Sequence, residues 1–172
     1  MSVFVLDSSV LFDLVHGGID REVLGHYSME TPLLMVSEVI EHHERLISSG
    51  LTFVPLSGEE EKLADAMLGE HGSGPGASRR QQKKRLSRVD CNLLALARSR
   101  QRCLLVADQA LRDIARGYGV ESRGLLWLIE SMAEQHVISS SHLAAALERI
   151  ALRPRARLPV PQVRELLDKL RS

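Results

Sequence analysis

The hydrophobic residues of this chain fall in short blocks, and the spacing inside the blocks alternates between strand-like and helix-like. Residues 2–6 form an apolar run rich in β-formers, which predicts a buried strand that ends at Asp7. Less regular runs predict further strands at 33–36 after Pro32, at 52–55, at 103–107 and from Val120.

Between the strands, apolar residues recur at helical spacing. Ser37 can cap a helix that carries Glu38 in its first turn, and Gly50 can end it. Ser87 and Asp90 have the S-x-x-D spacing of an N-terminal capping box, which predicts another helix start. Further helices are predicted after Asp7 and after Asp108, over 58–70, from Gly124, over 142–150 with Ser141 as its cap, and over 161–171.

A strand followed by a helix, repeated several times, favours a parallel sheet covered by helices. The expected fold is therefore α/β, a three-layer α/β/α sandwich around a central, mostly parallel sheet. With 172 residues, of which 44% are hydrophobic, the chain is long enough for one domain with a real core. We place that domain at 1–150. Residues 151–172 are predicted to form a C-terminal helical extension that packs on the domain or on a partner.

The sequence indicates a cytoplasmic protein. It has no unbroken apolar run of about 18 residues, so no membrane span is expected. The N-terminus lacks the pattern of a signal peptide. The two cysteines, Cys91 and Cys103, lie among apolar residues outside any C-x-x-C pair. This argues against a zinc knuckle and for buried, reduced thiols.

The net charge is zero, yet the charges are unevenly distributed. Residues 1–78 hold thirteen Asp and Glu against three Lys and Arg, a net of −10, and residues 79–172 carry the compensating +10. This asymmetry is compatible with an acidic pocket and a basic rim. It is equally compatible with two solvated faces.

Four acidic residues occupy positions at which chemistry is expected. Asp7 follows the first strand, Asp108 follows the strand at 103–107, and Glu38 and Asp90 each begin a helix. Ligands of open α/β sheets bind at the carboxyl ends of the strands, so these four residues can meet in one pocket. Mg²⁺ or Mn²⁺ prefers oxygen ligands, and a bound ion could activate a water and stabilise charge on a phosphate.

Each acid alone has a simpler explanation. Asp90 fits a capping box, Glu38 a first-turn acid favoured by the helix dipole, Asp7 a turn and Asp108 a helix cap. The combination is more specific than any one of them. Clustered carboxylates repel one another and cost stability, so a cluster would indicate a function.

Four segments resemble, in order and spacing, the acidic motifs of PIN-domain nucleases. The resemblance covers about residues 2–130. It implies a parallel α/β/α sandwich, a divalent metal and ribonuclease activity, as in the VapC-type toxins of toxin–antitoxin pairs. The segments are Phe-Val-Leu-Asp7-Ser-Ser-Val-Leu, Val-Ser-Glu38-Val-Ile, Arg-Val-Asp90-Cys-Asn-Leu-Leu-Ala-Leu-Ala and Leu-Leu-Val-Ala-Asp108-Gln-Ala-Leu.

The resemblance also implies roles for single residues and for partners. Ser9 matches a position at which the family often carries a small hydroxyl residue that supports the site. RNA is the implied substrate, and an antitoxin protein and a second copy of the chain are the implied partners. The acids implied to be both catalytic and metal-binding are Asp7, Glu38, Asp90 and Asp108.

Two features depart from the family pattern. Val106 stands where many relatives have Thr or Ser, two residues before the last acid. The tail after about residue 135 is longer than in a minimal toxin. Both features fit an alternative function, a catalytically weak PIN-like RNA-binding or scaffold protein.

A basic run lies just before Asp90. Its cations are expected to hold the RNA backbone if they lie near the metal pocket, and a solvated loop is the simpler explanation. Aromatic residues make up only 3% of the chain, so base stacking is not expected to dominate binding. The run consists of Arg79, Arg80, Lys83, Lys84, Arg85 and Arg88.

Two further patterns argue for other chemistry, and both are weak. A phosphotransferase of the haloacid-dehalogenase type would use Asp7 as its nucleophile, but that family expects a second Asp where Ser9 stands. His42 and His43 follow Glu38 and are expected at the surface, because no H-E-x-x-H motif surrounds them.

Overall fold

Five parallel strands form the centre of the computed structural model, which describes residues 2–71, 85–154, 156 and 158–172. The strands lie in the order β3-β2-β1-β4-β5, so β1 is central. All four pairings between neighbouring strands are parallel. The strand bounds are β1 Val3–Leu6, β2 Ser28–Pro32, β3 Thr52–Val54, β4 Cys103–Leu105 and β5 Ser122–Arg123.

Helices connect these strands and follow the last one. In the described ranges the α-helices are α1 Ser8–Gly17, α2 Asp20–His26, α3 His43–Ser49, α4 Gly58–His71, α5 Arg88–Ser99, α6 Gln109–Gly117, α7 Leu125–Glu134, α8 Ser140–Ala151 and α9 Val160–Arg171. Two short 3-10 helices, η1 Leu33–Ser37 and η2 Ile40–His42, lie between β2 and α3.

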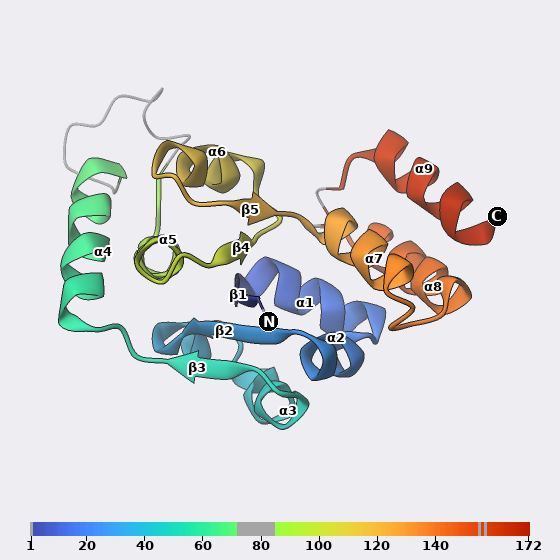
Figure 1. Ribbon diagram of the computed structural model, residues 1–172, viewed down its shortest axis with the longest axis horizontal. Coiled ribbons are helices and arrows are strands. Elements are labelled where there is room, and N and C mark those ends of the chain that lie inside the picture. Colours follow the sequence, from blue (N-terminus) through green and yellow to red (C-terminus); the bar gives the residue numbers. More distant parts are fainter. Residues whose placement is uncertain (1, 72–84, 155, 157) are drawn as a thin grey trace.

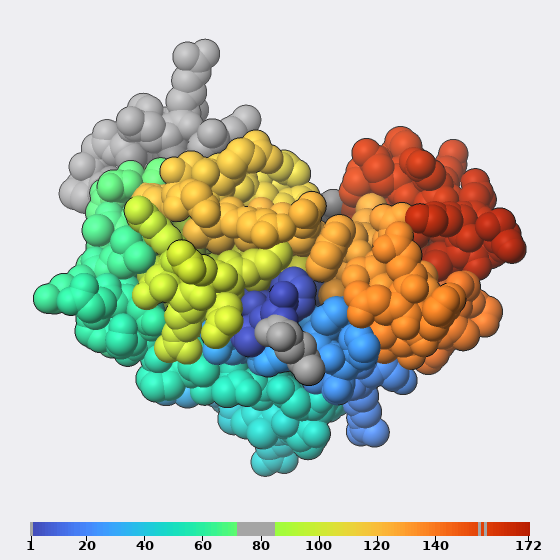
Figure 2. Space-filling model, viewed as in Figure 1, coloured from blue at the N-terminus to red at the C-terminus, as the bar shows by residue number. Residues whose placement is uncertain are grey.

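The helices form layers on both sides of the sheet (Figure 1). α4 and α5 cover one side, where α5 contacts β1, β2 and β4. α1, α2, α7 and α8 lie on the other side, and α9 packs on α7 and α8. In Figure 2 the C-terminal helices form a lobe at one end of the molecule. This arrangement confirms the predicted α/β/α sandwich.

The burial of α5 agrees with the apolar residues that make up most of its sequence from Val89 to Ala97. Its residues from Val89 to Ala97 are buried apart from Asp90, because the sheet covers one side of the helix and α4 the other. A helix that is apolar on every side is stable only when it is enclosed. Asp90 therefore sits at the start of a rigid, buried element.

Helix caps fix the positions at which the site-bearing helices begin and end. Asp7 caps α1, Ser87 caps α5 and Asp108 caps α6, each through a side-chain oxygen that accepts a backbone N–H of the first turn. α1 ends at Gly18, whose φ of 70° is a left-handed conformation that glycine adopts without steric cost.

The predicted strand at 33–36 is wrong, because the strand lies just before it. β2 contains the polar residues Glu30 and Thr31, which hide it in the sequence. Thr31 is nevertheless fully buried, since its Oγ1 donates a 2.8 Å hydrogen bond to the carbonyl of Leu6. The apolar side chains of Leu33 and Leu34, which resembled a strand, are largely exposed in η1.

Two predicted helix starts are also wrong. Ser37 does not cap a helix, because its Oγ donates to the carbonyl of Leu34 within η1, and the next α-helix begins only at His43. The cap of α8 is Ser139 instead of Ser141, so this helix begins two residues earlier than predicted. In both cases several serines or apolar residues competed for the same role.

α9 is attached to the layer formed by α7 and α8. Lys169 pairs with Glu130 of α7 at 2.5 Å, and Arg171 pairs with Glu148 of α8. The apolar side of α9 is buried against these helices. The domain boundary at residue 150 stays a prediction. No helix in the described ranges is long and apolar enough to cross a membrane.

Both cysteines are free thiols, with Cys91 buried and Cys103 half-buried. Burial raises the pKa of each thiol to about 11. Neither is therefore a thiolate at neutral pH, and neither offers a reactive nucleophile.

Candidate functional site

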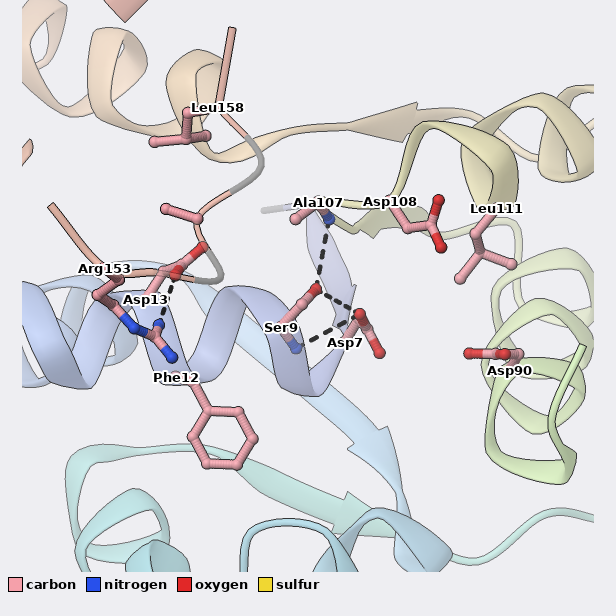
Figure 3. Close-up of a pocket in the computed structure, with 11 residues that line it drawn as sticks. Asp7, Ser9, Phe12, Asp13, Asp90, Ala107, Asp108, Leu111, Arg153 and Leu158 are labelled. Carbon is pink, nitrogen blue, oxygen red and sulfur yellow. Dashed lines mark hydrogen bonds and ion pairs between the residues drawn. The ribbon is translucent and has the colours of Figure 1, made fainter. Parts of the chain in front are cut away.

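A cavity of about 300 Å³ opens at the carboxyl edge of the sheet (Figure 3). It lies beside the ends of β1 and β4, where the strand order changes direction along the chain. Ligands of open α/β folds bind at such switch points. The residues that line the cavity are Asp7, Ser9, Phe12, Asp13, Asp90, Ala107, Asp108, Leu111, Arg153, Ala156 and Leu158.

Asp7 is the predicted acid that lies deepest, with 8% of its surface exposed. Its backbone N–H donates to the carbonyl of Leu105 at 3.0 Å, which ties the end of β1 to β4. Burial raises the pKa of Asp7, the hydrogen bond from Ser9 lowers it in part, and the negative charge of Asp90 raises it again. The carboxylates of Asp7 and Asp90 therefore lie close enough to repel each other.

The side chain of Ser9 links Asp7 to the backbone after β4. Its Oγ donates a 2.5 Å hydrogen bond to Oδ2 of Asp7 and accepts a 3.4 Å hydrogen bond from the backbone N–H of Ala107. Ser9 therefore contacts Asp7 directly, and its predicted supporting role stays a prediction. Val106, which replaces a hydroxyl residue of many PIN relatives, is fully buried and does not line the cavity. Among the described lining residues, Ser9 is the one that carries a hydroxyl.

Asp90 forms the predicted capping box and also faces the cavity. Its Oδ2 accepts the backbone N–H of Ser87 at 2.9 Å, and its own N–H donates to Oγ of Ser87 at 3.1 Å. Figure 3 shows its carboxylate directed toward Asp7. The cap thus fixes the direction of the acid.

Asp108 combines the same two properties. Its Oδ1 accepts the backbone N–H of Ala110 at 2.8 Å, which caps α6, and its side chain lines the cavity. The residue is exposed. Helix capping and a position in the site are therefore compatible, although either explanation alone would account for the sequence pattern.

The three acids share a pattern of hydrogen bonding. Each commits one oxygen to a local donor: Oδ2 of Asp7 to Ser9, Oδ2 of Asp90 to Ser87 and Oδ1 of Asp108 to Ala110. The second oxygen of each acid has no hydrogen-bond partner among the residues that the structure describes. One oxygen of each carboxylate thus orients the side chain through a local hydrogen bond.

Glu38 does not line the cavity with the other three acids. It is exposed at the end of η1, and its Oε2 accepts a 2.7 Å hydrogen bond from Oγ of Ser8, the residue next to Asp7. The structure therefore brings Asp7, Asp90 and Asp108 together and connects Glu38 to them only through α1. The predicted role of Glu38 in metal binding stays a prediction.

The acids of the cavity fit a hydrated cation better than a fully enclosed one. No three His, Cys, Asp or Glu side chains within the described ranges converge closely enough to surround a metal ion. Mg²⁺ keeps several of its waters and is usually held by one or two carboxylates together with phosphate oxygens. Asp7 and Asp90 provide such a pair.

The histidines after Glu38 pack on aromatic rings. The ring of His42 lies 6.0 Å from that of Phe12, and the ring of His43 lies 4.8 Å from that of Phe53. Both histidines were expected at the surface, but they are half-buried against these rings, and neither lines the cavity.

Two residues of the predicted basic run lie in the described part of the chain. Arg85 is exposed, and Arg88 forms an ion pair with Asp65 of α4. The other four, Arg79, Arg80, Lys83 and Lys84, lie outside the described residues. The contribution of this run to RNA binding stays a prediction.

The cavity contains an ion pair that the sequence analysis missed. Asp13 of α1 is 7% exposed and accepts a 2.6 Å hydrogen bond from Nη1 of Arg153. Burial raises the pKa of Asp13, whereas the charge of Arg153 lowers it. An acid within the apolar stretch from Val10 to Val15 was the available signal, because a buried carboxylate needs a partner. That partner is 140 residues away and left no trace in the local pattern.

Comparison with known proteins identifies the family. A family model described as DUF3368, a PIN domain, matches residues 59–172, which is more than half of the chain. The chain therefore belongs to this PIN-domain family, and PIN domains are generally nucleases. The matched range contains Asp90, Asp108 and Arg153, and it begins after Asp7 and Glu38.

Comparisons with individual proteins add little to this result. No curated protein matches the chain. Among solved structures, the chain is similar to a PilT N-terminus domain protein, SSO1118, from the hyperthermophilic archaeon Sulfolobus solfataricus P2. The similarity has a TM-score of 0.49 and 17% sequence identity, and it covers 77% of this chain and 94% of that one.

Proposed function

We propose that this protein is a divalent-metal-dependent endoribonuclease of the cytoplasm, with Asp7, Asp90 and Asp108 as its metal-site residues. The observation that carries the proposal is the cavity at the switch point of the sheet, whose lining includes Asp7 after β1, Asp90 of α5 and Asp108 before α6. Membership of a PIN-domain family supports hydrolysis of phosphodiester bonds as the reaction.

A bound Mg²⁺ or Mn²⁺ would supply Lewis acidity, which neutralises charge on the phosphate and makes a water more acidic. The free oxygens of Asp7 and Asp90 would hold such an ion, because Ser9 and Ser87 fix the opposite oxygens. Asp108 is the most exposed residue of the three, and its free oxygen is the group proposed to accept a proton from the attacking water. Glu38 is proposed to support Asp7 through Ser8.

The decisive experiment is a cleavage assay on labelled single-stranded RNA with Mg²⁺ or Mn²⁺. Wild type should cleave the RNA, and EDTA should abolish cleavage. Asp7→Asn and Asp90→Asn should each lose at least about a hundredfold in rate, the range seen when one member of a catalytic group is removed. Asp113→Asn is a matched control, because Asp113 lies on α6 outside the cavity and pairs with Arg116.

The alternative to a nuclease is a protein that binds RNA without cleaving it. Val106 and the absence of a three-ligand cluster in the described residues support it. RNA binding by wild type without cleavage in either metal, unchanged in Asp7→Asn, would favour this alternative. A matched DNA substrate belongs in the same assay, because DNA offers the same phosphate to a metal.

The toxin role is a further part of the proposal and rests on the resemblance to VapC-type toxins. Expression of wild type in a bacterial host should arrest growth, and expression of Asp7→Asn at the same level should not. Growth at the wild-type rate in both cases would count against a toxin and leave the nuclease proposal standing.

The proposed partners are an antitoxin and a second copy of the chain. Exposed apolar side chains beside a groove support a protein partner: Leu33, Leu34 and Ile40 are 52%, 42% and 72% exposed and line it together with Pro55 and Leu56. Ile40→Asp should convert a homodimer into a monomer in light scattering. An unchanged dimer would place the interface elsewhere.

A further inference from the structure

The lining of the proposed site carries an excess of negative charge, which one bound metal ion would not fully neutralise. Among the residues that the structure describes, its lining contains four aspartates, Asp7, Asp13, Asp90 and Asp108, and one cation, Arg153. RNA is a polyanion, so each approaching phosphate is repelled by carboxylates that are not covered by a cation. The position and contacts of Arg153 therefore bear directly on how a substrate could enter.

Two backbone hydrogen bonds fix the main chain of Arg153, and one contact orients its side chain. It follows α8, where its backbone N–H donates to the carbonyl of Ile150 at 3.1 Å and its carbonyl accepts the N–H of Ala156 at 3.0 Å. Its Nη1 donates to Oδ1 of the buried Asp13 at 2.6 Å. A side chain that is already oriented loses less entropy when it binds a ligand.

The guanidinium of Arg153 has N–H groups that its contact with Asp13 does not use. Only Nη1 takes part in its pair with Asp13, and its other donors have no hydrogen-bond partner among the described residues. The side chain is 25% exposed and lines the cavity. Figure 3 places Arg153 and Asp13 on the opposite side of Ser9 from Asp90. A guanidinium with free donors matches the oxygen spacing of a phosphate.

A second arginine shows what a purely structural pair looks like in this protein. Arg45 donates through both Nε and Nη2 to the two oxygens of the buried Asp20, at 2.8 and 2.6 Å. In that pair both oxygens of the carboxylate accept a hydrogen bond from the arginine. Neither Arg45 nor Asp20 lines the cavity. The pair of Arg153 and Asp13 has one contact instead of two and lies at the site.

We infer that Arg153 is a substrate-binding residue that takes a backbone phosphate of the nucleic acid at the end of the cavity away from Asp90, with Asp13 as its positioning residue. The inference rests on the proposed function for the identity of the substrate. It assigns the segment after α8, at the C-terminal end of the chain, a direct part in substrate binding.

The test is a titration of labelled single-stranded RNA at several salt concentrations, in EDTA and again in Ca²⁺. Loss of one phosphate contact should reduce the slope of log affinity against log salt by about 0.7. Arg153→Gln should show this reduction and bind about tenfold more weakly. Arg153→Lys should keep the slope and recover part of the affinity, because it keeps the charge without the planar fork.

Two controls separate binding from stability. Arg45→Gln breaks a pair with another buried aspartate, outside the cavity, so it should lower the melting temperature without changing the slope. The double variant Asp13→Asn/Arg153→Gln removes both charges together and should show the reduced slope even if Arg153→Gln folds poorly. In the cleavage assay with Mn²⁺, Arg153→Gln should raise KM more than it lowers kcat.

The outcomes distinguish the two proposals. An unchanged slope in Arg153→Gln and in the double variant overturns the inference, whether or not wild type cleaves RNA. A reduced slope with no cleavage by wild type in any metal supports the inference and counts against the nuclease. Wild type that binds no RNA in either EDTA or Ca²⁺ overturns both.

Discussion

The hydroxyl of Ser9 donates a hydrogen bond of 2.5 Å to Oδ2 of Asp7 and also accepts the N–H of Ala107 at 3.4 Å. One side chain thus joins the acid after β1 to the backbone after β4. The relationship matters because β1 and β4 are neighbours only in the folded sheet. The orientation of Asp7 is therefore coupled to the pairing of the two strands that frame the cavity.

Replacement of Ser9 by alanine should impair the site without removing an acid. Ser9→Ala removes a hydrogen bond that lowers the pKa of Asp7, so this pKa should rise further. Cleavage that needs ionised Asp7 should then begin at a higher pH than in wild type. A pH–rate profile measures the shift, and Ser48→Ala, a substitution on α3 outside the cavity, is the control. Superimposable profiles would show that the Ser9 contact has no effect on Asp7.

Asp7 should reduce the stability of the metal-free protein at neutral pH. Its pKa is raised above the value of 3.8 that an unfolded chain has, so ionisation favours the unfolded state as the pH rises through that range. Asp7→Asn should therefore raise the free energy of unfolding at pH 7 relative to wild type. The difference should disappear below pH 3.8, where both side chains are neutral.

Urea denaturation in EDTA at several pH values measures this difference. Asp113→Asn serves again as the control, since Asp113 lies outside the cavity. A wild type that is more stable than Asp7→Asn at pH 7 would contradict the expected sign.

Divalent metal should stabilise the folded protein independently of any substrate. A ligand that binds only the folded state at a hundred times its dissociation constant adds about 2.7 kcal/mol to the free energy of unfolding. Mn²⁺ should therefore raise the melting temperature of wild type, and the rise should be smaller in Asp90→Asn. An equal rise in both proteins would place the metal away from Asp90.

Glu38 should matter less than the acids that line the cavity. It contacts Ser8 instead of the cavity, so Glu38→Gln, which can still accept the hydrogen bond from Ser8, should keep most of the activity. We expect a loss of no more than about tenfold, compared with about a hundredfold or more for Asp90→Asn. The cleavage assay compares the two variants directly. Equal losses would make Glu38 a member of the metal site.

Much of the fold and three of the four candidate acids could be predicted because each depends on a local signal. Asp7 ends an apolar strand, Asp90 occupies a capping box and Asp108 follows another apolar run. The rule that parallel strands place their carboxyl ends at one edge then brought these residues together. Local pattern and topology agree here, and the structure places Asp7, Asp90 and Asp108 in the lining of one cavity.

The errors arose where tertiary contacts override local pattern. Thr31 is fully buried in β2 because it bonds to Leu6 across the sheet, so polarity concealed a real strand. Exposed Leu33 and Leu34 imitated a strand that does not exist. Glu38 was placed in the pocket because a helix start was expected at Ser37, and the chain instead forms η1 there. No sequence pattern links Asp13 to Arg153.

The cavity takes its walls from almost the entire length of the polypeptide, from Asp7 to Leu158. During synthesis, β1 emerges from the ribosome long before its neighbour β4, and Arg153 emerges later still. A nascent chain shorter than about 158 residues therefore lacks part of the lining, however well its early segments fold. Translation itself thus delays the complete site, and a ribosome that stalls before that point carries an unfinished one.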